Sequence, residues 1–225
     1  MLQSIVKADS YLHKGLRSKL IEQLRQLGIK NEQVLQAINQ VPRHFFLDPA
    51  FEDYAYRNEA FQIGAGQTIS QPYTVAYQTE LLEVKKFDKI FEVGTGSAYQ
   101  SCVLASLGAL VYSVERQKEL FDYNNHFFYL KQFPQIKRFF GDGFAGLPSY
   151  APFDKAIITA AAPFVPQAII DQLKVGGILV LPLDKGDGTK QVMHKIIKHA
   201  DGIESIALDE FSFVPMLQGK DNRKD

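Results

Sequence analysis

The segment FEVGTGSAYQ, residues 91–100, decides the fold class of this chain. An apolar run ends at Val93, glycines follow at positions 94 and 96, and a helix-like segment opens near Tyr99. In an open α/β sheet such a turn lies at the carboxyl end of a strand, where ligands bind. Glycine lets a ligand approach the backbone closely and leaves N–H groups free at the start of the helix. A tight turn that binds nothing would contain the same residues, so the neighbouring segments must decide between the two interpretations.

Short apolar runs alternate with helix-like segments around this loop. Such alternation predicts an α/β fold, a doubly wound and mainly parallel sheet with helices on both faces. Two further runs after Pro182, joined through Asp201 and Gly202, predict an antiparallel end to the sheet. The expected strands are residues 89–93, 109–114, 136–140, 155–160, 176–182, 190–200 and 204–215, and the expected helices begin near residues 99, 117 and 165.

The first part of the chain has a helical rhythm instead. Apolar residues between Leu16 and Ile29 recur at helical spacing, and Gly28 follows as a C-cap. Asn31 can cap a second helix, which must end before Pro42. We therefore expect residues 1–75 to form an N-terminal helical cap with an active-site loop, residues 76–219 to form the cofactor-binding core, and residues 220–225 to form a solvated polar tail.

The composition disfavours several functional classes. Lys and Arg together number 25 and balance 25 Asp and Glu, so the chain has no net field that would attract nucleic acid or anionic lipid. The single cysteine, Cys102, excludes an internal disulfide and fits a reducing compartment. No apolar run reaches the roughly eighteen residues of a membrane span, and the first residues lack the core of a signal peptide. We expect a soluble, cytoplasmic monomer that binds neither nucleic acid nor membrane.

A carboxylate follows the glycine loop at an informative distance. Glu115 ends the next apolar run, roughly twenty residues on, as expected for an acid that accepts hydrogen bonds from ribose hydroxyls. Tyr99 replaces the third glycine of a dinucleotide fingerprint, so a pyrophosphate fits poorly. Glu92 would repel a phosphate at this strand end but would suit an ammonium group. These features together favour S-adenosylmethionine, which has an ammonium group and no phosphate.

A third contact is expected in FFGDGF, after the third strand of the core. Asp142 and Gly143 could meet the adenine edge with a carboxylate and a backbone N–H. Gly-Asp-Gly is also a common turn sequence. Its position at a strand end, like those of the glycine loop and Glu115, favours the adenine contact.

The segment GAGQTISQPYTVA, residues 64–76, lies ahead of the glycine loop and carries two hydroxyl groups. Thr68 and Ser70 could cap a helix that begins near Pro72, whose ring suits a first helical turn. The chain has no G-x-S-x-G elbow, so Ser70 is not expected to be a hydrolase nucleophile. A capping role and a role in a ligand site are compatible.

These segments resemble one known family in order and spacing. The motifs VPRHFF, IGAGQTISQP, FEVGTGSAYQ, GDG, PFDKAIITAAAP, LKVGGILVLP and FVP, between about Val41 and Gly219, are similar to those of protein-L-isoaspartate O-methyltransferases. The resemblance implies a Rossmann-like, class I methyltransferase fold. It implies methyl transfer from S-adenosylmethionine to the carboxylate of L-isoaspartyl residues in damaged proteins and peptides, leaving S-adenosylhomocysteine. The ester then cyclises to a succinimide, which opens partly to normal aspartate.

The resemblance also implies roles for individual residues. Ser70 matches the family's active-site serine, and it would orient an acceptor carboxylate that is already ionised and needs no base. Ala98 and Gln62 depart from the family pattern of glycine and proline, and they bear on cofactor affinity and peptide preference. The expected cofactor contacts are Gln67, Thr68, Ile69, Glu92, Gly94, Gly96, Ser97, Glu115, Asp142 and Gly143, and the expected peptide contacts are Ile63, Gly64, Val214 and Pro215.

Other residues are expected to be structural. The histidines show no metal-ligand spacing, so no metal is expected, and His44 is expected to pack among aromatic rings. Arg43 is a candidate for an ion pair that fastens the N-terminal helices to the core. Two alternatives stay open, a methyltransferase acting on another carboxylate or a small molecule, and a catalytically silent module that binds S-adenosylmethionine. An NAD-dependent dehydrogenase is the least compatible, because of Tyr99.

Overall fold

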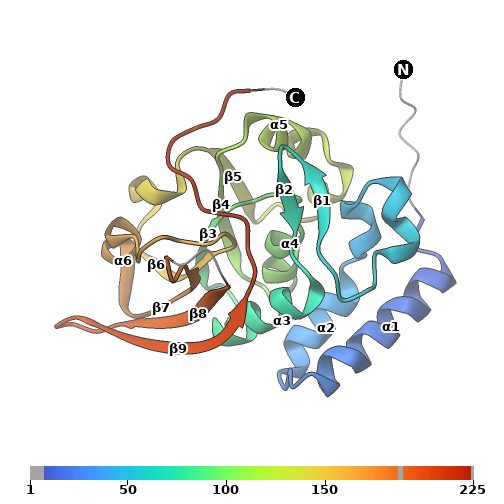
Figure 1. Ribbon diagram of the computed structural model, residues 1–225, viewed down its shortest axis with the longest axis horizontal. Helices are drawn as coiled ribbons and strands as arrows, with labels where there is room; N and C mark the ends of the chain where they lie inside the picture. Colours follow the sequence, from blue (N-terminus) through green and yellow to red (C-terminus); the bar gives the residue numbers. More distant parts are fainter. Residues whose placement is uncertain (1–7, 187–189, 224–225) are drawn as a thin grey trace.

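A seven-stranded sheet forms the centre of the molecule in this computed structural model, which describes residues 8–186 and 190–223 (Figure 1). The strand order is β5-β4-β3-β6-β7-β8-β9. Strands β3 to β7 pair in parallel, and β8 and β9 continue the sheet antiparallel. The strands are β3 (Lys89–Val93), β4 (Leu110–Glu115), β5 (Ile136–Phe140), β6 (Phe153–Ile158), β7 (Leu173–Leu183), β8 (Gln191–Lys198) and β9 (Ile203–Phe211).

Helices cover both faces of this sheet. The α-helices are α1 (Tyr11–Gln26), α2 (Glu32–Gln40), α3 (Pro72–Leu81), α4 (Tyr99–Ser106), α5 (Lys118–His126) and α6 (Gln167–Gln172). Short 3₁₀ helices are η1 (Arg43–Phe46), η2 (Pro49–Tyr54), η3 (Phe128–Gln132), η4 (Gly143–Ala145) and η5 (Pro148–Tyr150). Within the described parts of the chain, no helix is both long and apolar enough to cross a membrane.

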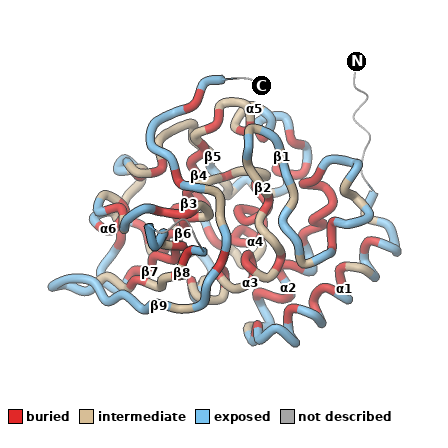
Figure 2. Tube along the Cα trace, in the orientation of Figure 1, coloured by how far each residue is buried: buried red, intermediate tan, exposed pale blue. Residues whose placement is uncertain are grey.

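The alternation of side chains along the strands builds two cores. Ile90 of β3 packs with Leu104 of α4 on one face of the sheet, whereas Phe91 packs with Ile169 of α6 on the other. Figure 2 shows the inner strands mostly buried and β9 mostly exposed at the edge of the sheet. The predicted doubly wound, mainly parallel fold with an antiparallel end is therefore confirmed.

The first helices form the predicted cap against α3 and α4. Asn31 begins α2 by accepting the backbone N–H groups of Gln33 and Val34, as expected. Gly28 follows the end of α1 with φ +104°, a backbone region that favours glycine. In Figure 2 buried and exposed residues alternate along α1, because one face of the helix joins the core.

The structure contains a β-hairpin that the hydrophobic pattern did not predict. It lies on the same side of the molecule as the glycine loop (Figure 1). Its strands are β1 (Phe61–Gly64) and β2 (Gln67–Ile69), which pair antiparallel. The turn residues Ala65 and Gly66 both have positive φ, +49° and +64°, as a tight hairpin requires. Its strands are too short to show a clear alternation in sequence, and this is why the pattern missed them.

The end of the chain is packed, contrary to the expected solvated tail. Residues 212–221, here called the C-terminal strap, run from the end of β9 to the start of α5, in red in Figure 1. The backbone N–H of Lys118 donates to the carbonyl of Asp221 at 2.9 Å, and the N–H of Asp221 donates to the carbonyl of Arg116 at 2.8 Å. Asp221 is 8 % exposed. The expectation was wrong for Asp221, because polar side chains do not reveal backbone pairing; residues 224 and 225 lie outside the described residues.

Candidate active site

Three adjoining cavities meet at the carboxyl ends of β3, β4 and β6, beside the point where the strand order reverses. Thr68 and Thr159 line all three, so the cavities adjoin one another, and together they are here called the cleft. The strand-end pocket is lined by Gln67, Thr68, Val93, Gly94, Gly96, Val114, Glu115, Arg116, Gly143, Thr159, Ala160, Val214, Pro215, Met216 and Leu217. The outer groove extends from Ser70 to the C-terminal strap, and the junction pocket joins Ser70 to the glycine loop.

Gly94 and Gly96 take the position in the cleft that the sequence predicted. A Cβ added to Gly94 would lie 2.6 Å from the Oγ1 of Thr159, and the φ of Gly94 is +91°. The Thr159 hydroxyl itself donates to the carbonyls of Val93 and Gly94 at 3.0 and 2.9 Å. No side chain fits at position 94. Glycine therefore lets the loop backbone pack directly against the strand ends, and no side chain at this position projects into the strand-end pocket.

The N–H groups of this loop were expected to be free, and here the expectation was wrong. The N–H of Gly94 donates to the carbonyl of Val114 at 2.9 Å. The N–H of Gly96 donates to Oε2 of Glu115 at 2.8 Å. Because these donors are already used, the loop is poorly equipped to bind a phosphate, in agreement with the absence of a third glycine.

Glu115 lies at the floor of the strand-end pocket. Its Oε1 accepts the N–H of Gln117 at 2.8 Å and its Oε2 accepts that of Gly96, so the carboxylate is held rigidly. Each carboxylate oxygen has a second lone-pair site, so hydroxyl donors of a ligand can still bind. Burial raises the pKa of Glu115, and the two N–H donors act against this rise.

Gly143 also lines the strand-end pocket, but Asp142 does not. The Oδ1 of Asp142 accepts the N–H of Phe144 at 2.9 Å, and its Oδ2 accepts the N–H of Gly219 at 2.8 Å. Asp142 therefore holds the C-terminal strap close to the pocket. A Cβ at Gly143 would lie 2.2 Å from Cγ1 of Val93, so the close packing of strand ends requires glycine there.

Glu92 does not reach the cleft. It is 0 % exposed, and the hydroxyl of Ser101 on α4 donates to its Oε2. Burial raises its pKa to about 7. The side chain of Glu92 points toward α4 because alternate residues of a strand face opposite ways, and the preceding Phe91 faces α6. The geometry gives no support to the predicted contact with an ammonium group.

Ser70 stands at the meeting point of the outer groove and the junction pocket. It is half-buried, and its hydroxyl forms no hydrogen bond with the other residues that the structure describes. The junction pocket also contains Thr68, Ile69, Gly94, Gly96 and Ser97, so the structure brings Ser70 and the glycine loop together as predicted.

The capping role considered for Thr68 and Ser70 was wrong. Helix α3 begins at Pro72, as expected, with Gln71 as an N-cap that makes no side-chain bond. Instead Oδ1 of Asn58 accepts the N–H of Tyr73 at 2.8 Å. A residue fifteen positions earlier in the chain thus serves the helix start, which local sequence patterns cannot show.

The four expected peptide contacts separate into two places. Val214 and Pro215 line the strand-end pocket, and Val214 also lines the outer groove beside Ser70. Ile63 and Gly64 line a different cavity, here called the hairpin groove, together with Gly96, Ser97 and Tyr123. The structure therefore places only Val214 in the same groove as Ser70.

The structure shows where the two departures from the family pattern, Ala98 and Gln62, lie. Ala98 is the N-cap residue directly before α4, has φ +68° and is 0 % exposed, so an alanine occupies a backbone region that favours glycine. Gln62 lies in β1 and lines the hairpin groove.

Several lining residues were missed by sequence reasoning. Thr159 directly follows β6, and its place at a strand end was the available signal. Arg116 follows Glu115 in the same way. Met216 and Leu217 belong to the C-terminal strap, whose return to the sheet no local pattern predicts.

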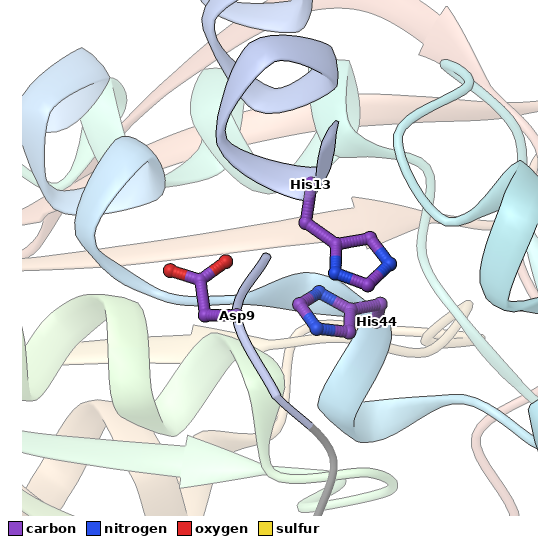
Figure 3. Close-up of side chains that lie close together, drawn as sticks. All are labelled: Asp9, His13 and His44. Atoms are coloured by element: carbon purple, nitrogen blue, oxygen red, sulfur yellow. The ribbon is translucent and has the colours of Figure 1, made fainter. Parts of the chain in front are cut away.

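A polar cluster in the cap lies outside the cleft and contains Asp9, His13 and His44 (Figure 3). The two imidazole rings stack with centroids 3.7 Å apart. The nearest partners of the ring nitrogens are Ser10, Glu52, Tyr56 and the carbonyl of Ala8, and Arg17 contacts both carboxylate oxygens of Asp9 at 3.0 Å. The potential metal ligands are thus already paired within the protein. Burial, with the charge of His13, lowers the pKa of His44 to about 4.

The doubly wound sheet, the glycine loop after β3 and the carboxylate at the end of β4 define the class of Rossmann-like S-adenosylmethionine-dependent methyltransferases. The family model for protein-L-isoaspartate(D-aspartate) O-methyltransferase matches residues 15–221. The chain therefore belongs to the protein-L-isoaspartate(D-aspartate) O-methyltransferase family, and the resemblance found in its sequence is confirmed.

Individual relatives agree. The chain is 53 % identical over 213 residues to a protein-L-isoaspartate O-methyltransferase of Flavobacterium psychrophilum, covering 94 % of this chain and 99 % of that protein. It is 52 % identical to the one from Flavobacterium johnsoniae, with the same 94 % and 99 % coverage. A solved structure from Plasmodium falciparum, described as a protein-L-isoaspartate O-methyltransferase with S-adenosyl-L-homocysteine, has a TM-score of 0.77 at 24 % identity, covering 91 % of this chain and 98 % of that chain. At that identity the likeness shows the fold.

Proposed function

We propose that this protein transfers a methyl group from S-adenosylmethionine to the carboxylate of L-isoaspartyl residues in proteins and peptides. One observation carries the proposal: Ser70 and the glycine loop line the same junction pocket. An acceptor held by Ser70 from the outer groove therefore lies against a cofactor held by the loop in the strand-end pocket.

The residues of the strand-end pocket fit the cofactor. Glu115 offers carboxylate lone pairs to ribose hydroxyls, and the closely packed Gly143 and Val93 line the same pocket, where a flat base can lie against them. Gln67, Thr68 and Ile69 reach the cleft from β2, and Ser97 reaches it from the glycine loop. S-adenosylmethionine supplies a methyl group on a sulfonium, which is reactive toward an oxygen nucleophile without further activation.

The contribution of the protein is alignment of the acceptor. An isoaspartyl carboxylate is ionised near neutral pH, so no general base has to remove a proton. The Ser70 hydroxyl can donate to one carboxylate oxygen and direct the other toward the junction pocket. Holding two groups in line in this way lowers the barrier by converting a bimolecular encounter into an oriented one.

Substrate binding uses the outer groove and the strap. Val214 lies in the outer groove with Ser70, and Pro215 follows it in the strand-end pocket, so an extended peptide can contact the main chain of this segment whatever its own side chains. Ile63 and Gly64 contact the substrate only if the peptide continues into the hairpin groove. We also propose that the protein acts as a monomer in the cytoplasm, where its single cysteine stays reduced.

Paired peptides test the reaction directly. The purified protein and methyl-labelled S-adenosylmethionine are offered two peptides that differ only in isoaspartate against aspartate. We expect label in the isoaspartyl peptide and not in its partner. Equal labelling of both would assign the enzyme to another acceptor, and tight S-adenosylhomocysteine binding without labelling of any acceptor would identify a silent binding module.

Ser70→Ala tests the role of the serine. Loss of one hydrogen bond to a charged group should lower kcat about 10- to 100-fold, while the Kd for S-adenosylhomocysteine, measured by calorimetry, stays within about twofold. Ser149→Ala is the matched control, because Ser149 is an exposed serine of η5 that lines none of the three cavities of the cleft. An unchanged kcat in Ser70→Ala would remove Ser70 from the mechanism.

A further inference from the structure

Arg43 is a charged residue buried completely inside the protein. It belongs to η1, directly after the first two helices, and it is 0 % exposed. Within the described residues no carboxylate pairs with it, so the expected ion pair was wrong. Burial lowers the pKa of its guanidinium to about 10. Placing a cation there is unfavourable unless specific contacts compensate for lost hydration.

The contacts of Arg43 lead to both halves of the cleft. Its Nη2 donates to the carbonyl of Ser70 at 2.8 Å and to that of Glu59 at 3.3 Å. Its guanidinium carbon lies 5.0 Å from the ring centroid of Tyr99. Tyr99 is the first residue of α4, directly after the glycine loop. One planar side chain thus touches the residue that would hold the acceptor and the helix start that follows the cofactor loop.

The backbone at Ser70 needs such support. Ser70 and Gln71 form a short link between the end of β2 and the start of α3 at Pro72, and they belong to neither element. Asn58 fixes the helix side of the link through the N–H of Tyr73. Arg43 fixes Ser70 itself, through the Ser70 carbonyl. The Ser70 hydroxyl remains free to face the junction pocket.

Packing alone does not explain the choice of arginine. Its Nε and Nη1 have no hydrogen-bond partner in the described structure, and unpaired buried donors destabilise the folded state. An apolar side chain of similar length would fill the same space without that disadvantage. What it could not supply is a donor directed at the Ser70 carbonyl from a cation that lies over the ring of Tyr99.

We propose that Arg43 is a positioning residue that fixes the Ser70 hydroxyl relative to the glycine loop. The expected effect of Arg43 on turnover rests on the proposed function, whereas its expected effect on the backbone around Ser70 does not. Arg43→Met keeps the length of the side chain and removes the donor. Arg43→Lys keeps a charge and a donor but loses the guanidinium that lies over the Tyr99 ring, and it serves as the second variant if Arg43→Met does not fold.

The structural consequence is measured by hydrogen exchange, which needs no turnover. In Arg43→Met, and more weakly in Arg43→Lys, we expect amide exchange to rise about tenfold or more in the peptide spanning residues 67–75, with β7 unchanged. Unchanged exchange in that peptide would overturn the proposal, whatever reaction the protein performs. Leu24→Ala in α1 is the control, because Leu24 is buried in the same cap but its apolar side chain donates no hydrogen bond to the backbone at Ser70.

The catalytic consequence is measured with the isoaspartyl peptide. We expect kcat to fall about 10- to 100-fold in Arg43→Met and less in Arg43→Lys, because a displacement of about 1 Å is enough for such losses, with S-adenosylhomocysteine affinity within about threefold. In a Ser70→Ala background the same substitution should change kcat by less than about twofold, because the hydroxyl that Arg43 positions is gone. If the Arg43 substitution lowered kcat by the same factor in the unmodified protein and in Ser70→Ala, Arg43 would have only a structural role. Absence of turnover in the unmodified protein would instead count against the proposed function.

Discussion

Two glutamates show how strand geometry decides which residues reach the cleft. Glu92 and Glu115 were both expected to contact the cofactor, and both lie at carboxyl ends of neighbouring strands. Glu115 ends its strand and its side chain reaches the pocket, whereas Glu92 lies one residue inside its strand and faces α4. The sequence can predict that an acid lies near the strand end. The side to which its side chain turns follows from the register, which becomes clear only when the neighbouring helices are placed.

Gly94→Ala should be far more damaging than alanine at another glycine with positive φ. At Gly66, φ +64° and open space, alanine adds only backbone strain of about 1 kcal/mol. At Gly94 the new methyl group would also lie 2.6 Å from the Oγ1 of Thr159, which lines all three cavities. We expect Gly94→Ala to lower the free energy of unfolding by at least about 2 kcal/mol and to weaken S-adenosylhomocysteine binding about tenfold or more.

Denaturant unfolding and calorimetry of the two alanine variants check this. Gly66→Ala should retain the affinity for S-adenosylhomocysteine within about twofold. Equal losses of stability in the two variants would mean that the close contact with Thr159 is relieved by a small shift, and that Gly94 is required only for its backbone conformation.

At the scale of elements, the parallel strands and their helices follow from local sequence, and the connections that complete the cleft do not. Pro72 correctly marked the start of α3, but its cap comes from Asn58. The β1–β2 hairpin depends on backbone pairing between two very short neighbouring strands, and the C-terminal strap depends on backbone pairing with distant segments. Hydrophobic periodicity reports which face of a segment is buried, so it is blind to short segments held mainly through their backbones.

The C-terminal strap should contribute to cofactor binding although its last residues are polar. A chain that ends at Gly219 loses the two backbone hydrogen bonds of Asp221 with Arg116 and Lys118, which together contribute about 2 kcal/mol. Met216 and Leu217, which line the strand-end pocket, are then no longer held in place from their C-terminal side. We expect the Kd for S-adenosylhomocysteine to rise about 5- to 30-fold.

Calorimetric titration of the shortened chain measures this effect. Arg223→Ala is the matched control, because it removes an exposed side chain that pairs with Asp221 and keeps both backbone hydrogen bonds. Its affinity should stay within about twofold of the unmodified protein. Normal affinity in the shortened chain would show that the strap is held without its last residues.

The whole molecule combines two buried groups whose titrations act in opposite directions. Burial raises the pKa of Glu92 to about 7 from 4.5 and lowers that of His44 to about 4 from 6.5. Between those values the folded protein keeps a proton on Glu92 that the unfolded chain has released, so the free energy of unfolding falls as pH rises. At His44 the unfolded chain binds the proton that the folded protein excludes, so the free energy of unfolding rises with pH. From about pH 4.5 to 6.5 the two slopes oppose each other.

Glu92→Gln should therefore expose the contribution of His44. The stability of the unmodified protein minus that of Glu92→Gln should fall by about 1.4 kcal/mol per pH unit between about pH 4.5 and 7, and then level off. Urea unfolding at half-unit steps of pH measures the difference, with Asp201→Asn, an exposed residue between β8 and β9, as the control. Parallel pH profiles for Glu92→Gln and the unmodified protein would mean that the Glu92 carboxyl is already ionised within the fold. The hydroxyl of Ser101 would then have to support a buried anion between β3 and α4 against the repulsion of the Glu115 carboxylate, and binding of S-adenosylhomocysteine would gain no pH dependence from this residue.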